Sequence, residues 1–320
     1  MSSWRTWHRP LVLFSASMVV MAVVAAVGLL VDDRVVAGSP IWAKPFKFAL
    51  SFVPYTLTLA WMLTLLTRGR RTGWWAGTVV ALACLGEMVI ITGQVARGRR
   101  SHFNNETPFD ATLYSAMAVT VVILWAGTLA IAILLLRARI ADRASAWAVR
   151  SGVLIALAGA GLGYLMTRPS ALQREAGDLD TADVIGAHSV GVPDGGPSMP
   201  LTGWSTTGGD LRVPHFIGMH ALQALPLFLL ALIALAPRIA RLRDPRVRLR
   251  LVLVTSGAYA AVVALLTWQA LRGLPLVHPD GATLTAAAMI PAVTAAGAIA
   301  ALRPAGARTK AGASHKEPVS

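Results

Sequence analysis

Cysteine is almost absent from this sequence, and charged residues are scarce. The single cysteine, Cys84, lies inside an apolar stretch, so the chain cannot form an intramolecular disulfide bond. Only 14% of the residues are charged, whereas 55% are hydrophobic, and the mean hydropathy is +0.61. The apolar runs exceed what the core of one globular domain could bury. This composition argues against a soluble domain and predicts an all-α integral membrane protein.

Several familiar motifs are also missing. The sequence has no Walker loop, paired CxxC motif, GxSxG elbow or HExxH motif, so no local pattern favours nucleotide-driven transport or the common hydrolases. The net charge of +14 would suggest nucleic-acid binding in a soluble protein. Here the basic residues lie in short loops between apolar stretches, so we interpret them as topology signals and expect no nucleic-acid partner. Arginine outnumbers lysine 25 to 4, which favours a GC-rich bacterial genome and thus a bacterial inner membrane.

Apolar windows of about 20 residues, long enough to cross a ~30 Å hydrocarbon core, are the main feature that is present. Eight such windows predict membrane-spanning helices in a lipid bilayer, at residues 10–31, 46–66, 74–95, 111–136, 146–166, 213–236, 249–271 and 283–302. The first window is too long for a signal peptide and lacks a clear cleavage site after it, so we interpret it as a retained helix.

The distribution of basic residues predicts the orientation of these helices. If both termini are cytoplasmic, that side carries 19 of the 29 Lys and Arg residues and only 3 acidic residues. Lys and Arg are enriched in cytoplasmic loops, so we expect both termini on the inner side of the cell membrane. The loop at 167–212 then lies outside, where its Gly, Pro and Asp residues favour either a lid or a largely disordered segment. The tail at 303–320 is expected to be disordered and cytoplasmic.

Short similarities between the two halves predict an internal repeat. FALSFVP at 48–54 resembles HALQALP at 220–226, QVARG at 94–98 resembles QALRG at 269–273, and DDRV at 32–35 resembles DLRV at 210–213. Their common order and nearly constant separation favour a four-plus-four duplication, with one repeat at 1–145 and the other at 146–302. Four helices return the chain to its starting side, so the two copies should have the same orientation.

A polar stretch, DLRVPHFIGMHALQ at 210–223, leads into the sixth predicted helix. Polar groups there need partners inside the protein because lipid offers none. His215 and His220 lie about 140° apart on a helix, so they form a weak metal motif alone. With His102 they become candidate ligands of haem or a transition metal. A structural interhelical hydrogen bond is the alternative for His220.

A second polar face lies on the third predicted helix. Glu87, Ile91, Gln94 and Gly98 fall on one side, which suggests a proton path from a buried carboxyl group to the outer site. The alternative for Glu87 is a protonated carboxyl with a packing role. The candidate catalytic residues are Glu87, His102, Asp110 and His220. Asp110 has the alternative role of N-cap of the fourth helix.

Basic residues near the outer face could bind an anionic substrate. Lys44 and Lys47 enter the second predicted helix from outside, where they would either extend to lipid headgroups or bind an anion. The candidate substrate-binding residues are Lys44, Lys47, Gln94, Arg97, Arg212 and Gln223.

Two functions follow from these residues. The first is a membrane-embedded redox protein or enzyme with an outward-facing site that holds haem or a transition metal through histidine. The alternative is a transporter whose basic vestibule binds a small anion or a lipid headgroup and whose Glu87 carries a proton. A third reading is a non-catalytic assembly or sensor protein. The four-plus-four plan resembles haem A synthase in architecture alone, because the paired histidine signatures of that family do not occur at matching places.

Overall fold

The computed structural model describes residues 6–179 and 181–303. Within these residues, eight helices are long and apolar enough to cross a membrane, and each overlaps one of the eight expected windows. Their number and positions are therefore confirmed. The helices are α1 Arg9–Val31, α2 Ala43–Leu63, α3 Arg70–Ala96, α4 Pro108–Arg137, α5 Arg143–Met166, α7 Arg212–Leu235, α8 Pro245–Leu271 and α9 Gly281–Leu302.

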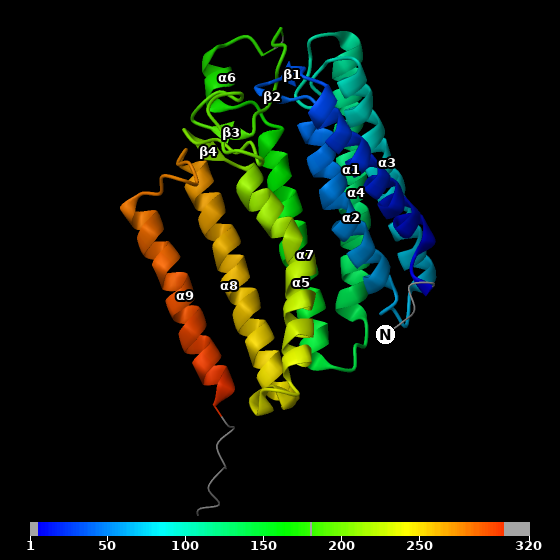
Figure 1. Cartoon of the computed structure of the whole chain (residues 1–320), viewed down its shortest axis with the longest axis vertical. Coiled ribbons are helices and arrows are strands. Elements are labelled where there is room, and N and C mark those ends of the chain that lie inside the picture. The colour runs from blue at the N-terminus through cyan, green and yellow to red at the C-terminus, as the bar shows by residue number, and fades with distance from the viewer. Residues whose placement is uncertain (1–5, 180, 304–320) are drawn as a thin grey trace, which may run out of the picture.

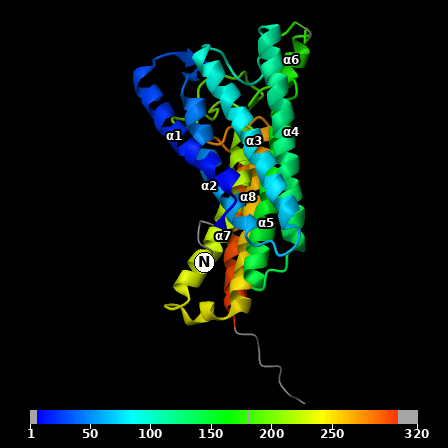
Figure 2. The same ribbon diagram turned by 90° about the vertical axis from the view of Figure 1, so that its right-hand side faces the viewer.

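The long helices run side by side along the longest axis of the molecule, as Figures 1 and 2 show. α9 forms one edge of the assembly, with α8 next to it and α5 and α7 near the middle. The first half occupies the other side. There α1 packs against α2 and α3 against α4, while in the second half α5 packs against α7 and α8 against α9.

One end of the helix assembly carries most of the irregular structure, and we call it the loop end. It contains the short helix α6 Ala171–Glu175 and two small antiparallel pairs, β1 Val35–Val36 with β2 Ser39–Pro40 and β3 Ser189–Val190 with β4 Gly209–Asp210 (Figure 1). The opposite end carries the 3₁₀ helix η2 Ala240–Arg243. α1 begins and α9 ends on this opposite side. The predicted tail, apart from Arg303, lies outside the described residues.

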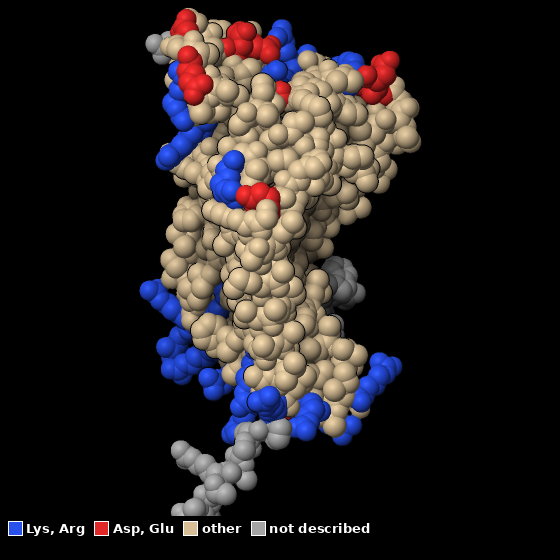
Figure 3. Space-filling view, turned by 90° about the vertical axis from the view of Figure 1, so that its left-hand side faces the viewer, with Lys and Arg blue, Asp and Glu red and all other residues tan. Residues whose placement is uncertain are grey.

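Charged side chains gather toward the two ends of the molecule. On the face in Figure 3, an almost uncharged band separates them, and the acidic residues lie mostly toward the loop end. Basic residues dominate the opposite end. An uncharged band between charged ends is the surface that a protein spanning a bilayer needs.

A close glycine crossing joins α5 to α7. A Cβ atom at Gly159 would lie 2.5 Å from the backbone carbon of Gly218, so no larger residue fits at this approach. Small residues at a helix crossing let the backbones come together, which is a common way to pack helices in membranes. Leu222, on the same side of α7, is fully buried in the main hydrophobic cluster. This crossing fixes the start of α7 relative to the rest of the fold.

The long connection between α5 and α7 is folded over the loop end. The side chain of Gln173 donates to the carbonyl oxygens of Val184 and Gly186, at 3.0 and 3.1 Å, and so ties α6 to the following segment. The connection between α3 and α4 is joined to the same segment, because Ile185 N donates to Phe103 O at 3.2 Å. Residues 167–179 and 181–212 are therefore folded over the loop end rather than largely disordered.

Candidate functional site

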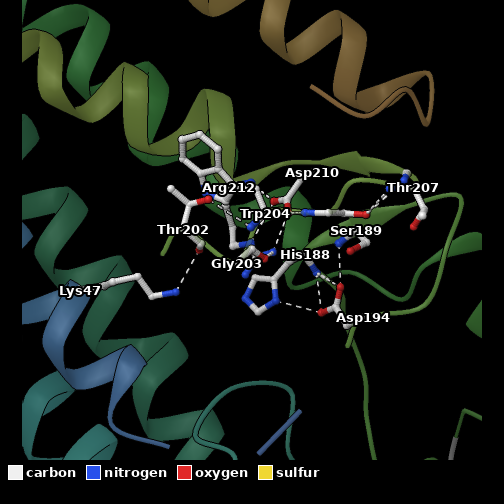
Figure 4. Close-up of polar contacts among 12 residues, drawn as sticks. Lys47, His188, Ser189, Asp194, Thr202, Gly203, Trp204, Thr207, Asp210 and Arg212 are labelled. Atoms are coloured by element: carbon white, nitrogen blue, oxygen red, sulfur yellow. Dashed lines mark hydrogen bonds and ion pairs between the residues drawn. The ribbon is translucent and has the colours of Figure 1, made fainter. Parts of the chain in front are cut away.

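Arg212, the first residue of α7, is held by its own chain. Its Nε and Nη2 atoms donate to the two carboxylate oxygens of Asp210, at 2.9 and 2.6 Å, and Nη2 also donates to the carbonyl oxygen of Gly203 at 2.6 Å (Figure 4). Asp210 is buried and accepts a further hydrogen bond from Ser205 N at 2.8 Å. A bidentate pair of this kind fixes the plane of the guanidinium group.

Lys47 is bonded to Thr202, the residue before Gly203 in the same loop. Its ammonium group donates to the carbonyl oxygen of Thr202 at 3.0 Å (Figure 4). Thr202 lies in a turn closed by Met199 N donating to Trp204 O at 2.8 Å. Gly203 has φ of +68°, a left-handed conformation that glycine adopts without strain. The turn thus presents two consecutive carbonyl oxygens to cations on two different helices.

Lys44 lies one turn before Lys47 on α2 and is differently placed. It is partly buried, and no acceptor among the described residues lies within hydrogen-bonding distance of its ammonium group. Lys47 and Arg212 lie close enough to repel it electrostatically, and Glu87 and Asp194 close enough to attract it. We call Lys44, Lys47 and Arg212, together with His102 and His188, the basic cluster.

His102 lies over α2 because the connection between α3 and α4 folds back. Its ring meets that of Phe48 edge-on with centroids 5.9 Å apart, and its Nδ1 atom lies 3.1 Å from the Ser101 hydroxyl. Burial, together with the nearby charge of Lys44, holds the pKa of His102 well below its ordinary value. His102 is therefore neutral at neutral pH. One of its ring nitrogens can donate a hydrogen bond, and the other can accept one.

His188 reaches the same region from the long connection. Its Nδ1 atom donates to the carboxylate of Asp194 at 2.9 Å, and the backbone N–H groups of His188 and Ser189 donate to the same carboxylate at 2.9 and 2.8 Å. Burial lowers the pKa of His188 more than the pairing with Asp194 raises it. Burial would by itself raise the pKa of Asp194, but these hydrogen bonds hold it below its ordinary value.

The other candidate histidines make local contacts. His215 donates from Nδ1 to the Gly159 carbonyl oxygen at 2.8 Å, across the α5–α7 crossing. The Nδ1 atom of His220 lies 3.3 Å from the side-chain oxygen of Gln223, one turn further along α7. Within residues 6–179 and 181–303, no three His, Cys, Asp or Glu side chains are arranged to hold a metal ion. The three expected ligands, His102, His215 and His220, are thus not gathered into one site.

Glu87 is buried in the interior of the assembly. The Thr120 hydroxyl on α4 donates to one carboxyl oxygen, while the other, Oε2, is buried without a hydrogen-bond partner among the described residues. Ile91 and Gln94 are also buried on this face of α3, as the spacing predicts. An unpaired buried carboxyl oxygen is costly and therefore marks a position that merits a functional explanation.

Gln94, Arg97 and Asp110 come together, but they satisfy one another. Gln94 donates to the Asp110 carboxylate at 2.9 Å, and Arg97 donates to both the Gln94 side-chain oxygen and that carboxylate. The alternative role of Asp110 as N-cap is wrong, because Thr107 is the N-cap and its hydroxyl accepts from Asp110 N. Asp110 lies in the first helical turn, where a carboxylate favours the positive end of the helix.

The same local pairs occur in both halves of the chain. Arg97 follows α3 and pairs with Asp110 at the start of α4, while Arg272 follows α8 and pairs with Asp280 at the start of α9. In both the DDRV and the DLRV motif, the guanidinium group of the arginine donates to both carboxylate oxygens of the first aspartate. These pairs are Arg34 with Asp32 and Arg212 with Asp210. The sequence similarities therefore correspond to similar hydrogen bonds.

The sequence pattern alone does not indicate that Asp194, Thr202 and His188 are site residues. They lie in a connection without periodicity, and Thr202 acts through its backbone carbonyl, which every residue possesses. One signal was available in GAHSVGVPDGG at 186–196, where an aspartate in a glycine-rich turn follows a histidine by six positions. Such a turn can bring the two side chains together.

No family model, no curated protein and no solved structure matches this chain.

Proposed function

We propose that this chain is a multi-pass membrane protein that binds a small anion or an anionic lipid headgroup at the basic cluster and transports it together with a proton. The observation that carries the proposal is Lys44. Its ammonium group has no hydrogen-bond acceptor among the described residues, and Lys47 and Arg212 repel it. Glu87 and Asp194 attract it but do not form a hydrogen bond with it. Bringing like charges together away from bulk water is unfavourable unless an opposite charge compensates them. A bound anion would supply that compensation through charge-assisted hydrogen bonds.

The position of the cluster supports access from the loop end. Lys47 and Arg212 are both bonded to the 199–204 turn, so this turn of the loop end bridges two cations of the cluster. Under the orientation predicted from the basic residues, the loop end faces outward. An anion from the outside would then reach the first turn of α2, where Lys44 lies.

Glu87 is the residue best suited to carry the coupling proton. It is buried, its Oε2 atom is unpaired, and it lies within electrostatic range of Lys44. A carboxyl group in this position favours the neutral form unless a cation compensates it. When an anion pairs with Lys44, Glu87 loses part of that compensation and binds a proton more readily. Anion and proton would thus be bound together.

The repeated pairs at Arg97–Asp110 and Arg272–Asp280 support the proposal that the two halves descend from one four-helix unit in the same orientation. The first half contributes Lys44, Lys47 and His102, and the second contributes His188 and Arg212. The basic cluster would therefore lie between two related units, as substrate sites of transporters with internal repeats commonly do.

The hypothesis that histidines bind haem or a transition metal remains a prediction. His215 and His220 each have one ring nitrogen near an oxygen of their own surroundings, which leaves the other nitrogen of each ring as the only free ligand atom. Purified protein that contains a near-stoichiometric metal or haem, and loses it in His220→Ala, would favour the redox function over the transporter.

The test of the proposed function is binding and flux of inorganic phosphate. Purified protein should bind phosphate, and Lys44→Met should weaken binding about 10- to 100-fold, because a hydrogen bond to a charged group contributes ~1.5–3 kcal/mol. Arg174→Gln, which removes an exposed cation on α6, should leave binding unchanged. Proteoliposomes should show phosphate uptake with proton entry, and Glu87→Gln should abolish the proton movement. Protein that binds neither phosphate nor sulfate would contradict the proposal.

A further inference from the structure

His188 has a fixed tautomer because its ring is bonded to a carboxylate. A carboxylate only accepts hydrogen bonds, so the Nδ1 atom 2.9 Å from Asp194 carries the proton. Asp194 is itself fixed by two backbone N–H groups of the same segment. The neutral ring then has a bare lone pair at Nε2. No hydrogen-bond donor among the described residues reaches this atom.

Basic side chains from several elements lie near His188. Lys44 on α2 and Arg212 on α7 lie within electrostatic range of His188, as do His102 and His215. The nearest aromatic neighbour is Phe103, whose ring centroid lies 4.9 Å away and shields one side of the imidazole. In Figure 4 the His188 ring lies between Asp194 and the end of Lys47. These cations and burial together keep the pKa of His188 low, so the ring is neutral at neutral pH.

We infer that the basic cluster selects an oxyanion that still bears a proton, namely phosphate or the singly ionised form of a phosphomonoester, because His188 Nε2 accepts a hydrogen bond from the P–OH group of the ligand. This inference rests on the proposed anion site and specifies its ligand. In the cluster, the cations donate to the unprotonated oxygens, and His188 Nε2 accepts the hydrogen bond of the remaining proton. Sulfate and phosphodiesters carry no proton at neutral pH, so they would place an oxygen lone pair against that of Nε2.

The expected discrimination is large because it combines a lost hydrogen bond with repulsion between lone pairs. A site built to hydrogen-bond a hydroxyl group of its ligand can reject an analogue without it by up to ~10⁴-fold. The cluster is partly exposed, so we expect a preference for phosphate over sulfate of about 10- to 100-fold. A cluster that acted through charge alone would bind both anions similarly.

The experiment measures dissociation constants by calorimetry at pH 6.5, where about a quarter of a phosphomonoester still bears its second proton. The full chain is in phosphatidylcholine nanodiscs. The probes are inorganic phosphate, methyl phosphate, dimethyl phosphate and sulfate. Phosphate and methyl phosphate should bind, whereas dimethyl phosphate and sulfate should bind at least ~10-fold more weakly. Nanodiscs that contain phosphatidic acid distinguish the source of the phosphate group. If phosphatidic acid competes with added inorganic phosphate for the site, the ligand includes a lipid headgroup. If phosphatidic acid does not compete, the ligand is free phosphate.

His188→Asn is the decisive variant, because the asparagine amide can still donate to Asp194 but cannot reach the position of Nε2. Its preference for phosphate should fall to about 3-fold or less while sulfate affinity stays the same or rises. His278→Asn, at an exposed histidine outside the cluster, should keep the full preference. Asp194→Asn provides a second variant, since the ring is then free to change tautomer and the preference should also fall.

Two results would overturn the inference. Wild-type protein that binds sulfate as tightly as phosphate would show that the cluster does not recognise the proton, although the proposed anion site would stand. A preference that survives both His188→Asn and Asp194→Asn would remove His188 from the recognition. If no anion binds at all, the proposed function itself fails, which is a separate outcome.

Discussion

Lys47 and Thr202 are 155 residues apart in the chain, yet the Lys47 ammonium group lies 3.0 Å from the Thr202 carbonyl oxygen. The first half of the fold therefore fastens a turn that belongs to the second half. The neighbouring residue Leu201 is 96% exposed, so a protease can reach the turn. Two carbonyl oxygens of the same turn are bonded to Lys47 and Arg212. This combination makes the contact easy to test.

Lys47→Met should loosen the 199–204 turn, because it removes the hydrogen bond to Thr202 and retains the apolar stem. We expect chymotrypsin to cleave at Leu201 or Trp204 several times faster than in the wild type. Lys44→Met is the matched comparison, since Lys44 has no such bond to the turn and its loss should not speed cleavage. Equal cleavage rates in the wild type and Lys47→Met would show that the turn is held by other contacts.

Gly209→Ala should displace the long connection from the end of α8. A Cβ atom at Gly209 would lie 1.9 Å from the carbonyl oxygen of Ala270, and backbone cannot move aside as a side chain can. We expect a loss of about 1–3 kcal/mol in the free energy of unfolding, measured in detergent. Gly257→Ala on α8 is the control, because its Cβ would have open space. A loss in Gly257→Ala equal to that in Gly209→Ala would contradict the steric explanation.

Stability should fall as the pH drops from 7.5 to 5. His102 and His188 have lowered pKa values in the fold, so the unfolded chain binds more protons as the pH falls below about 6.5. Asp194 does not contribute in this range, since its lowered pKa affects stability only below about pH 4. Thermal unfolding should show a smaller pH dependence in His102→Gln than in the wild type. His278→Gln should retain the wild-type slope.

Topology can be tested at positions that the repeat makes equivalent. Reporter fusions after residues 70, 140, 245 and 310 should indicate the cytoplasm, and those near 105 and 190 the outside. In a Cys84→Ala background, cysteines at Ala96 and Leu271 should both react with an impermeant maleimide added from outside, since both positions are exposed and lie near the loop end of α3 and α8. Labelling of the two from opposite sides would exclude a repeat with a common orientation.

The helices could be predicted from the sequence because each is a long apolar run, and the bilayer length makes that signal strong. The buried face of α3 was also predictable, since Glu87, Ile91 and Gln94 follow the helical period and are all buried. The pairing of Asp210 with Arg212 follows from a motif that occurs twice. In each case, the residues that determine the local structure lie close to one another in the sequence.

The arrangement at the loop end could not be predicted in the same way. His188 is paired with Asp194 through a glycine-rich turn that has no period, and Lys47 bonds to a backbone carbonyl that the sequence does not distinguish. The sequence favours His220 because this histidine lies within a predicted helix. In the structure its Nδ1 faces Gln223 of the same helix, whereas His188, in the connection, lies within electrostatic range of Lys44 and Arg212.

Thr202 and Gly203 are neighbours in one closed turn, but the cations that they bind come from α2 and α7. The two carbonyl oxygens belong to adjacent residues, and the hydrogen bond from Met199 to Trp204 closes the turn that contains them. A displacement of this turn would therefore alter both contacts in the same event. Release of Lys47 from the turn should thus be coupled to loss of the bond between Arg212 and Gly203.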